Sequence, residues 1–141
     1  MNVLATMRRD GTVRSVLLAV GLLLAVALTA AMGLIHLWLW LEGYREVPVI
    51  GVLFLVNAIC AAVLIVALLA MPARLRRAVA ATAALFTAGT LASLVLSLTV
   101  GFLGVHELLQ TPLVPAALIV ESCGVLVLGL IALLAKPLTY R

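Results

Sequence analysis

The stretch GLIHLWLWLEGYREVPVIG, residues 33–51, separates two long apolar runs, 15–40 and 48–71. Its charged residues, Glu42, Arg45 and Glu46, fall within five consecutive positions, and both flanking runs continue without Lys or Arg in their central parts. A helix needs about 20 apolar residues to cross the ~30 Å hydrocarbon core of a bilayer. Because the polar break is so short, the two helices must lie antiparallel. This stretch therefore predicts a hairpin of two membrane-spanning helices.

The composition of the chain supports this interpretation. The 141 residues are 67% hydrophobic and only 10% charged, whereas soluble domains average about 45–50% apolar and about 25% charged residues. A domain of this size has too small an interior to bury so many hydrophobic residues, so part of its surface must face lipid. The net charge of +4 comes from dispersed basic residues, which in membrane proteins report orientation, so we expect no nucleic-acid partner.

Two further runs, 78–101 and 113–135, are as long and as apolar as the first two. The connections between the four runs are LEGYREV, PARLRR and GVHELLQTP, and none has room for a soluble domain. We therefore predict an all-α fold, a transmembrane four-helix up-down-up-down bundle, as a single domain over residues 1–141.

The basic residues predict the orientation of this bundle. Eight of the nine fall on one side of it, and only Arg45 lies on the other. The eight are Arg8, Arg9, Arg14, Arg74, Arg76, Arg77, Lys136 and Arg141. Cytoplasmic loops carry the Lys/Arg excess, so we expect both termini to be cytoplasmic in a bacterial inner membrane. The first run is longer than the apolar part of a signal peptide, so we expect it to be retained as a span.

Small residues predict how the helices pack, because lipid does not drive apolar helices together and close approach requires small side chains. Three spans carry such residues on one face, together with their deepest polar residues. They are Gly21, Ala25, Thr29 and Gly33 in the first, Gly89, Ser93 and Ser97 in the third, and Ala117, Glu121 and Gly124 in the fourth. We expect these faces to meet at the bundle centre.

Glu121 is the main candidate for chemistry within the bilayer. It lies about 12 Å below the start of the fourth run at Leu113, where a charged carboxylate costs at least about 2.5–3.5 kcal/mol. Two interpretations stay open: a proton or cation site, or a neutral acid that links helices by bonding to Asn57 or Ser93. The candidate intramembrane polar cluster consists of His36, Asn57, Ser93, Ser97 and Glu121.

A second candidate site lies in the loops opposite the termini, at Tyr44, Arg45, Glu46, His106 and Glu107. Arg45 lies against the charge bias of the bundle and beside carboxylates, which suits either an ion pair that holds the turn or a clamp for an anionic ligand.

No catalytic motif is present, and we predict neither an enzyme nor a cofactor. The two cysteines, Cys60 and Cys123, form no CxxC or metal-ligand spacing. The two histidines, His36 and His106, leave haem or metal ligation as the least favoured alternative, because neither has a second ligand close in sequence.

The segment IHLWLWLEGYREVPVIGVLFLVNA, residues 35–58, resembles the first hairpin of uncharacterised four-helix integral-membrane proteins of bacteria. Their hairpin reads His-Leu, then an acidic turn with Tyr, then Pro-x-x-Gly-x-Leu-Phe. The resemblance implies a four-helix membrane fold but no activity. It also implies that five residues are important, namely His36, Tyr44, Pro48, Gly51 and Phe54.

These observations predict a small polytopic membrane protein that acts as a non-catalytic accessory or interaction subunit of a membrane complex. The alternative is a small transporter or a proton- or cation-handling protein that uses Glu121. Beyond the lipid bilayer, a membrane-protein partner and a second copy of the chain both stay open as partners.

Overall fold

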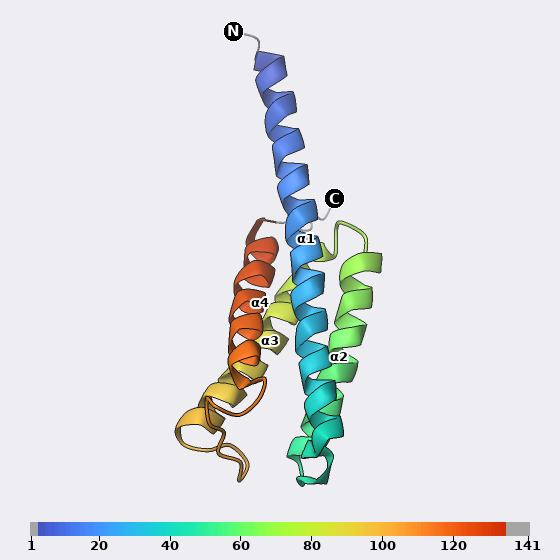
Figure 1. Ribbon diagram of the computed structural model, residues 1–141. Coiled ribbons are helices and arrows are strands. Elements are labelled where there is room, and N and C mark those ends of the chain that lie inside the picture. Colours follow the sequence, from blue (N-terminus) through green and yellow to red (C-terminus); the bar gives the residue numbers. More distant parts are fainter. Residues whose placement is uncertain (1–2, 135–141) are drawn as a thin grey trace.

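The structure, a computed structural model, describes the backbone of residues 3–134 and the side chains of residue 13 and residues 15–134. Over these residues four α-helices run alternately up and down the bundle (Figure 1). They are α1 (Val3–Glu42), α2 (Ile50–Ala70), α3 (Arg76–Thr99) and α4 (Val114–Leu134). A 3-10 turn, η1 (Tyr44–Glu46), joins α1 to α2. The predicted all-α up-down-up-down bundle is confirmed.

All four helices are long and apolar enough to cross a membrane, over Ser15–Glu42, Ile50–Ala70, Arg76–Thr99 and Val114–Leu134. These bounds differ by at most two residues from the predicted ones, apart from residue 135, which lies outside the described residues. The third span ends two residues early because Gly101 has a φ of 85°, a left-handed conformation that terminates helices.

Helix α1 is longer than its predicted span and extends beyond the other three helices (Figure 1). Residues 3–14 contain no proline and include Ala, Met, Leu and Arg, which favour helix. Five residues used for the orientation lie outside the residues whose side chains are described, namely Arg8, Arg9, Arg14, Lys136 and Arg141.

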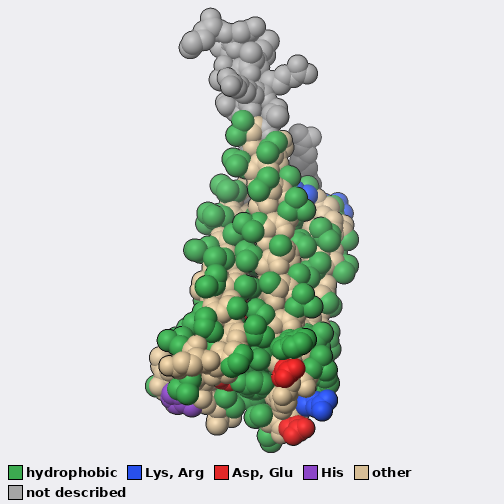
Figure 2. Space-filling model, in the orientation of Figure 1, with side chains coloured by type: hydrophobic (Ala, Val, Ile, Leu, Met, Phe, Trp, Pro, Cys, Tyr) green, Lys and Arg blue, Asp and Glu red, His purple; other side chains and the backbone are tan. Residues whose placement is uncertain are grey.

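Hydrophobic side chains cover the length of the helices on the face seen in Figure 2, and charged side chains gather toward the two ends. Large apolar residues such as Leu23, Val63 and Leu133 are more than 60% exposed, which lipid tolerates and water does not. This distribution fits a bundle whose outer surface faces hydrocarbon.

The helices do not pack evenly around the bundle. Helix α1 packs on both α2 and α4, and α3 packs on α4, whereas α2 and α3 are only in slight contact. The buried apolar core lies toward the end where α1 enters the bundle. It consists of Ala25, Leu68, Ala80, Ala83, Leu128 and Ile131. The side between α2 and α3 is therefore the thin side of the bundle, and the half of the bundle nearest η1 is called here the η1 half.

The predicted small-residue face is confirmed for α1. A Cβ at Gly33 would stand 2.7 Å from Cβ of Ala61 on α2, and Ala25 is fully buried. For α4, a Cβ at Gly124 would stand 3.2 Å from Cγ2 of Thr87 on α3. The prediction is wrong for Gly89, where a Cβ would meet nothing within 4 Å, because α3 turns Ala80, Ala83 and Thr87 toward its neighbours instead.

We expect Gly33→Ala to lower the thermal unfolding midpoint of the protein in detergent, because the new methyl group forces α1 and α2 apart. Overpacking of this kind costs about 1–3 kcal/mol. The matched control is Gly129→Ala on α4, where a Cβ meets nothing within 4 Å. If both variants unfold at the same temperature, the close approach at Gly33 does not contribute to stability.

A candidate intramembrane binding cavity

A cavity of about 450 Å³ lies in the η1 half, beside the thin contact between α2 and α3. Side chains from all four helices, η1 and the loop after α3 line it. Most of the lining is apolar, and the polar lining residues are His36, Tyr44, Asn57, Thr90, Ser93, Ser97, Glu107 and Glu121. The structure thus brings all five residues of the predicted intramembrane cluster to one cavity.

His36 and Glu121 face each other across this cavity. His36 Nε2 lies 3.9 Å from Oε1 of Glu121. The other ring nitrogen, Nδ1, lies 2.9 Å from the carbonyl oxygen of Met32, which can only accept a hydrogen bond, so Nδ1 must carry a proton. In the neutral ring the lone pair is therefore on Nε2, toward Glu121, and the pair can hold one additional proton between them.

Glu121 is almost completely buried, with 1% of its surface exposed, yet neither of its carboxyl oxygens has a hydrogen-bond partner among the described residues. Asn57, 7% exposed, donates from Nδ2 to Oγ1 of Thr90 at 2.9 Å, while its own Oδ1 likewise finds no partner in the described part of the chain. Buried polar atoms are nearly always satisfied, and an unmade bond costs about 1–3 kcal/mol. The bond from Glu121 to Asn57 or Ser93 that a purely linking role requires is not formed.

An aromatic column joins this pair to the η1 end of the bundle. The ring of Phe54 lies edge-on to His36, with centroids 5.0 Å apart, and stacks on Tyr44 at 4.8 Å. The hydroxyl of Tyr44 donates to Oε1 of Glu107, in the loop after α3. Aromatic pairs at these separations contribute about 0.5–1.5 kcal/mol beyond their burial. Residues far apart in sequence are thereby held in one line from η1 to Glu121.

Gly51 positions Tyr44 at the η1 end of this column. A Cβ at Gly51 would lie 2.6 Å from the carbonyl oxygen of Tyr44 and 2.8 Å from Cα of Arg45, so only glycine lets η1 rest on the first turn of α2. This contact gives a physical reason for the Tyr-x₆-Gly spacing of the first hairpin.

The hydroxyls of the two serines in the cluster donate hydrogen bonds to backbone carbonyl oxygens. Ser97 Oγ donates to the carbonyl oxygen of Val105 at 3.1 Å, and the backbone N–H of Glu107 donates to the carbonyl oxygen of Ser97 at 3.1 Å. These bonds fold the loop back over the end of α3 and bring Glu107 to Tyr44. Ser93 donates to the carbonyl oxygen of Gly89 at 2.9 Å. Both serines line the cavity, but their hydroxyl protons are already used in these hydrogen bonds.

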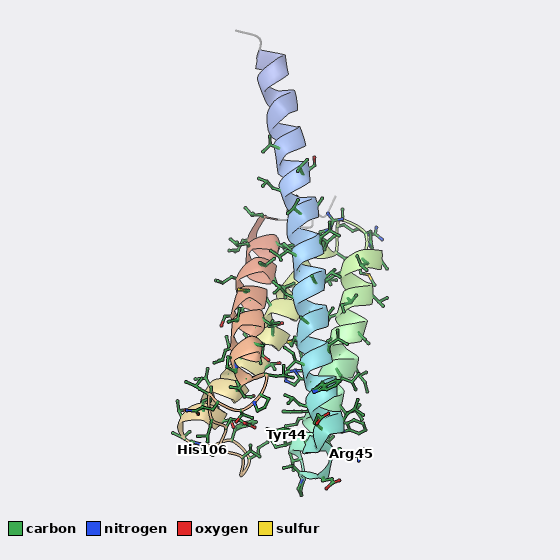
Figure 3. All side chains as sticks on the ribbon, viewed as in Figure 1. Tyr44, Arg45 and His106 are labelled. Atoms are coloured by element: carbon green, nitrogen blue, oxygen red, sulfur yellow. The ribbon has the colours of Figure 1, made fainter. Side chains whose placement is uncertain are left out.

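The predicted outer-loop site is divided by the structure. Tyr44 and Glu107 line the cavity, whereas Arg45 and Glu46 form an exposed pair with Nε and Oε1 4.0 Å apart. His106 is exposed and does not line the cavity. Figure 3 shows Tyr44, Arg45 and His106 at separate places near the η1 end, with Arg45 at the edge of the α1–α2 hairpin. The five residues do not converge on one ligand.

The two histidines also lie apart, His36 buried at the cavity and His106 exposed on the loop. Among the side chains that the structure describes, residue 13 and residues 15–134, no three or more His, Cys, Asp or Glu form a group that could hold a metal ion. The titratable acid and imidazole groups that line the cavity are His36, Glu107 and Glu121, and Glu107 is bonded to Tyr44.

The sequence reasoning missed the partner of Asn57, the pairing of Tyr44 with Glu107, and the gap beside Gly89. Thr90 lies next to Gly89 on α3, and its role depends on the rotation of that helix, which a uniformly apolar sequence does not reveal. Tyr44 and Glu107 belong to two different loops, and only the folded loop after α3 brings them together.

No family model, no curated protein and no solved structure matches this chain. Fold and cavity together define its class: a small protein of four helices, each of membrane-spanning length, around an acid-containing cavity.

We expect Tyr44 to ionise only at unusually high pH. Burial, the hydrogen bond to Glu107 and the charge of that carboxylate raise the pKa of Tyr44 above its usual value near 10. A raised pKa favours the neutral phenol in the folded protein. Its contribution to stability is therefore present below about pH 10 and is lost as the pH rises through the raised pKa.

Ultraviolet absorbance of phenolate during alkaline titration measures this pKa, and Tyr44→Phe, which leaves Tyr140 as the remaining tyrosine, isolates the Tyr44 component. Glu107→Gln should shift the Tyr44 transition to lower pH, whereas Glu46→Gln should leave it in place. An unchanged transition in Glu107→Gln would show that the two side chains are not bonded in solution.

Proposed function

We propose that the protein is a multi-pass protein of a bacterial inner membrane that binds a proton or another cation at Glu121 and moves it through the bilayer. The observation that carries this proposal is the carboxyl group of Glu121, 1% exposed and without a hydrogen-bond partner in the described residues, in a cavity of about 450 Å³. Ionisable residues in membrane spans mark ion pathways, proton relays and ligand sites.

The geometry around Glu121 supports a cation. Oxygen atoms of a carboxylate and an amide face the same cavity, and the lone pair of His36 Nε2 points toward Glu121. A proton or a cationic group would neutralise the carboxylate and remove the cost of burying it unpaired. His36, between the aromatic column and Glu121, is suited to pass a proton to or from the acid.

An accessory subunit is the alternative function. Such a role requires polar residues only where they link helices, and the Asn57–Thr90 bond is of that kind. Glu121 makes no such link within the described residues. Its burial therefore favours the cation-binding function over an accessory role.

We expect Glu121→Gln to reduce proton flux into proteoliposomes, followed with a trapped pH-sensitive dye, by at least about tenfold. Hydrogen bonds to charged groups contribute about 1.5–3 kcal/mol, which corresponds to at least that factor. The amide keeps the shape of the side chain, and gel filtration in detergent verifies that the variant is folded.

The control for this experiment is Glu46→Gln, because Glu46 is exposed and lies away from the cavity. It should conduct protons at the rate of the unaltered protein. Equal flux in all three proteins would exclude Glu121 as the transport site and leave the accessory role.

The proposed orientation places the ends of the chain in the cytoplasm and η1 on the opposite side, following the Lys/Arg excess. A green fluorescent protein fused after Arg141 should fluoresce, and an alkaline phosphatase at the same position should be inactive. Insertion of the phosphatase at Gly43 should instead give activity. The reverse pattern would invert the orientation.

A further inference from the structure

The exposed residues that line the cavity are on α2 and α3, which indicates an opening at the side of the bundle between these two helices. Three apolar residues both line the cavity and are exposed, namely Leu53 at 42%, Val56 at 44% and Leu85 at 75%. Gly89, also exposed, has nothing within 4 Å of where its Cβ would be. All four lie inside membrane-spanning helices, so the opening faces hydrocarbon.

The two ends of the cavity are more obstructed. Toward η1, the bonded pair Tyr44 and Glu107 lies over it, together with Phe102 and Val105 of the folded loop. Toward the opposite end, the buried apolar core, including the fully buried Ala25 and Leu128, fills the bundle. The side between α2 and α3, where the helices are in slight contact and the Asn57–Thr90 bond spans them, is the least obstructed route to Glu121.

The polar groups of the cavity select for a ligand that donates hydrogen bonds. Each polar donor group that lines it already donates at least one hydrogen bond to a protein acceptor, and the Asn57 amide has a second N–H. These donors are Nδ1 of His36, the amide of Asn57 and the hydroxyls of Tyr44, Thr90, Ser93 and Ser97. Among the described residues, the cavity atoms without a partner are acceptors when Glu121 is ionised, namely both oxygens of Glu121 and Oδ1 of Asn57.

We propose that the cavity binds a protonated amine with an apolar body, which enters from the lipid between α2 and α3 and donates to Glu121 and Asn57. The inference deepens the proposed function, on which it rests, by naming the class of cation. The rings of Phe54 and Phe86 line the same space, and aromatic faces attract ammonium groups. The cavity volume of about 450 Å³ falls within the range of roughly 300–1,000 Å³ typical of small-molecule sites.

The test measures equilibrium binding of 4-phenylbutylamine to the full chain in lipid nanodiscs, with binding to empty nanodiscs subtracted. The neutral analogue 4-phenylbutanol has the same shape without the charge, and methylammonium has the charge without the apolar body. The amine should bind saturably and at least about tenfold more tightly than either analogue, and Glu121→Gln should remove this preference.

Two variants test the route. Gly89→Leu adds a side chain at a position where a Cβ meets nothing within 4 Å, and Val56→Trp narrows the opening from α2, where Val56 is 44% exposed. Both should slow association of the amine by at least about tenfold. Gly129→Leu, on α4 and outside the cavity lining, should leave the association rate unchanged.

Each outcome decides between the two proposals. If flux depends on Glu121 but the amine does not bind, or binds no more tightly than the alcohol, the amine proposal is overturned and the proposed function stands. If the amine binds through Glu121 at an unchanged rate in both opening variants, entry from lipid is overturned. If Glu121→Gln alters neither flux nor binding, both proposals fail.

Discussion

Hydrocarbon provides no hydrogen-bond partners, and this constraint underlies the whole structure. Every backbone N–H and C=O within the bilayer must be satisfied inside the protein, which leaves helices as the available form for a chain of this kind. The same constraint acts on side chains: Thr29, Thr87 and Thr90 each donate to the carbonyl oxygen four residues earlier. Against this background, three buried oxygens without partners in the described chain are an exception, and they occur together.

The sequence predicted the fold because the fold depends on few variables. Run length, short polar breaks and the absence of Lys or Arg from the run centres determine four antiparallel helices, and the bounds agree within two residues. The membership of the cavity was also predictable for His36, Asn57 and Glu121, because depth in a span follows from residue number. The rotation of each helix about its own axis was not predictable. Apolar residues occur on every face of α3, so the sequence did not indicate that Gly89 faces a gap.

The uneven packing has a simple cause in side-chain size and a clear effect on the cavity. At one end, Ala25, Ala80 and Ala83 allow close approach, and Leu68, Leu128 and Ile131 fill the centre. In the η1 half, Gly33 draws α1 against α2, so α2 follows α1 while α3 follows α4. The space left between the two pairs is lined by the polar residues of the cavity, and of these Asn57 and Thr90 link α2 to α3.

The hydrogen bond between Tyr44 and Glu107 connects the two halves of the molecule. The molecule consists of two hairpins, α1–α2 and α3–α4, which share their main interface along α1 and α4. At the η1 end, this bond connects the loop of one hairpin to the loop of the other across 63 residues of sequence. A rotation of the hairpins about the α1–α4 interface would widen the gap between α2 and α3 at the cost of this bond and of the Asn57–Thr90 bond, while every helix stayed intact. The Tyr44–Glu107 and Asn57–Thr90 bonds thus both hold the two hairpins together on the side away from the α1–α4 interface.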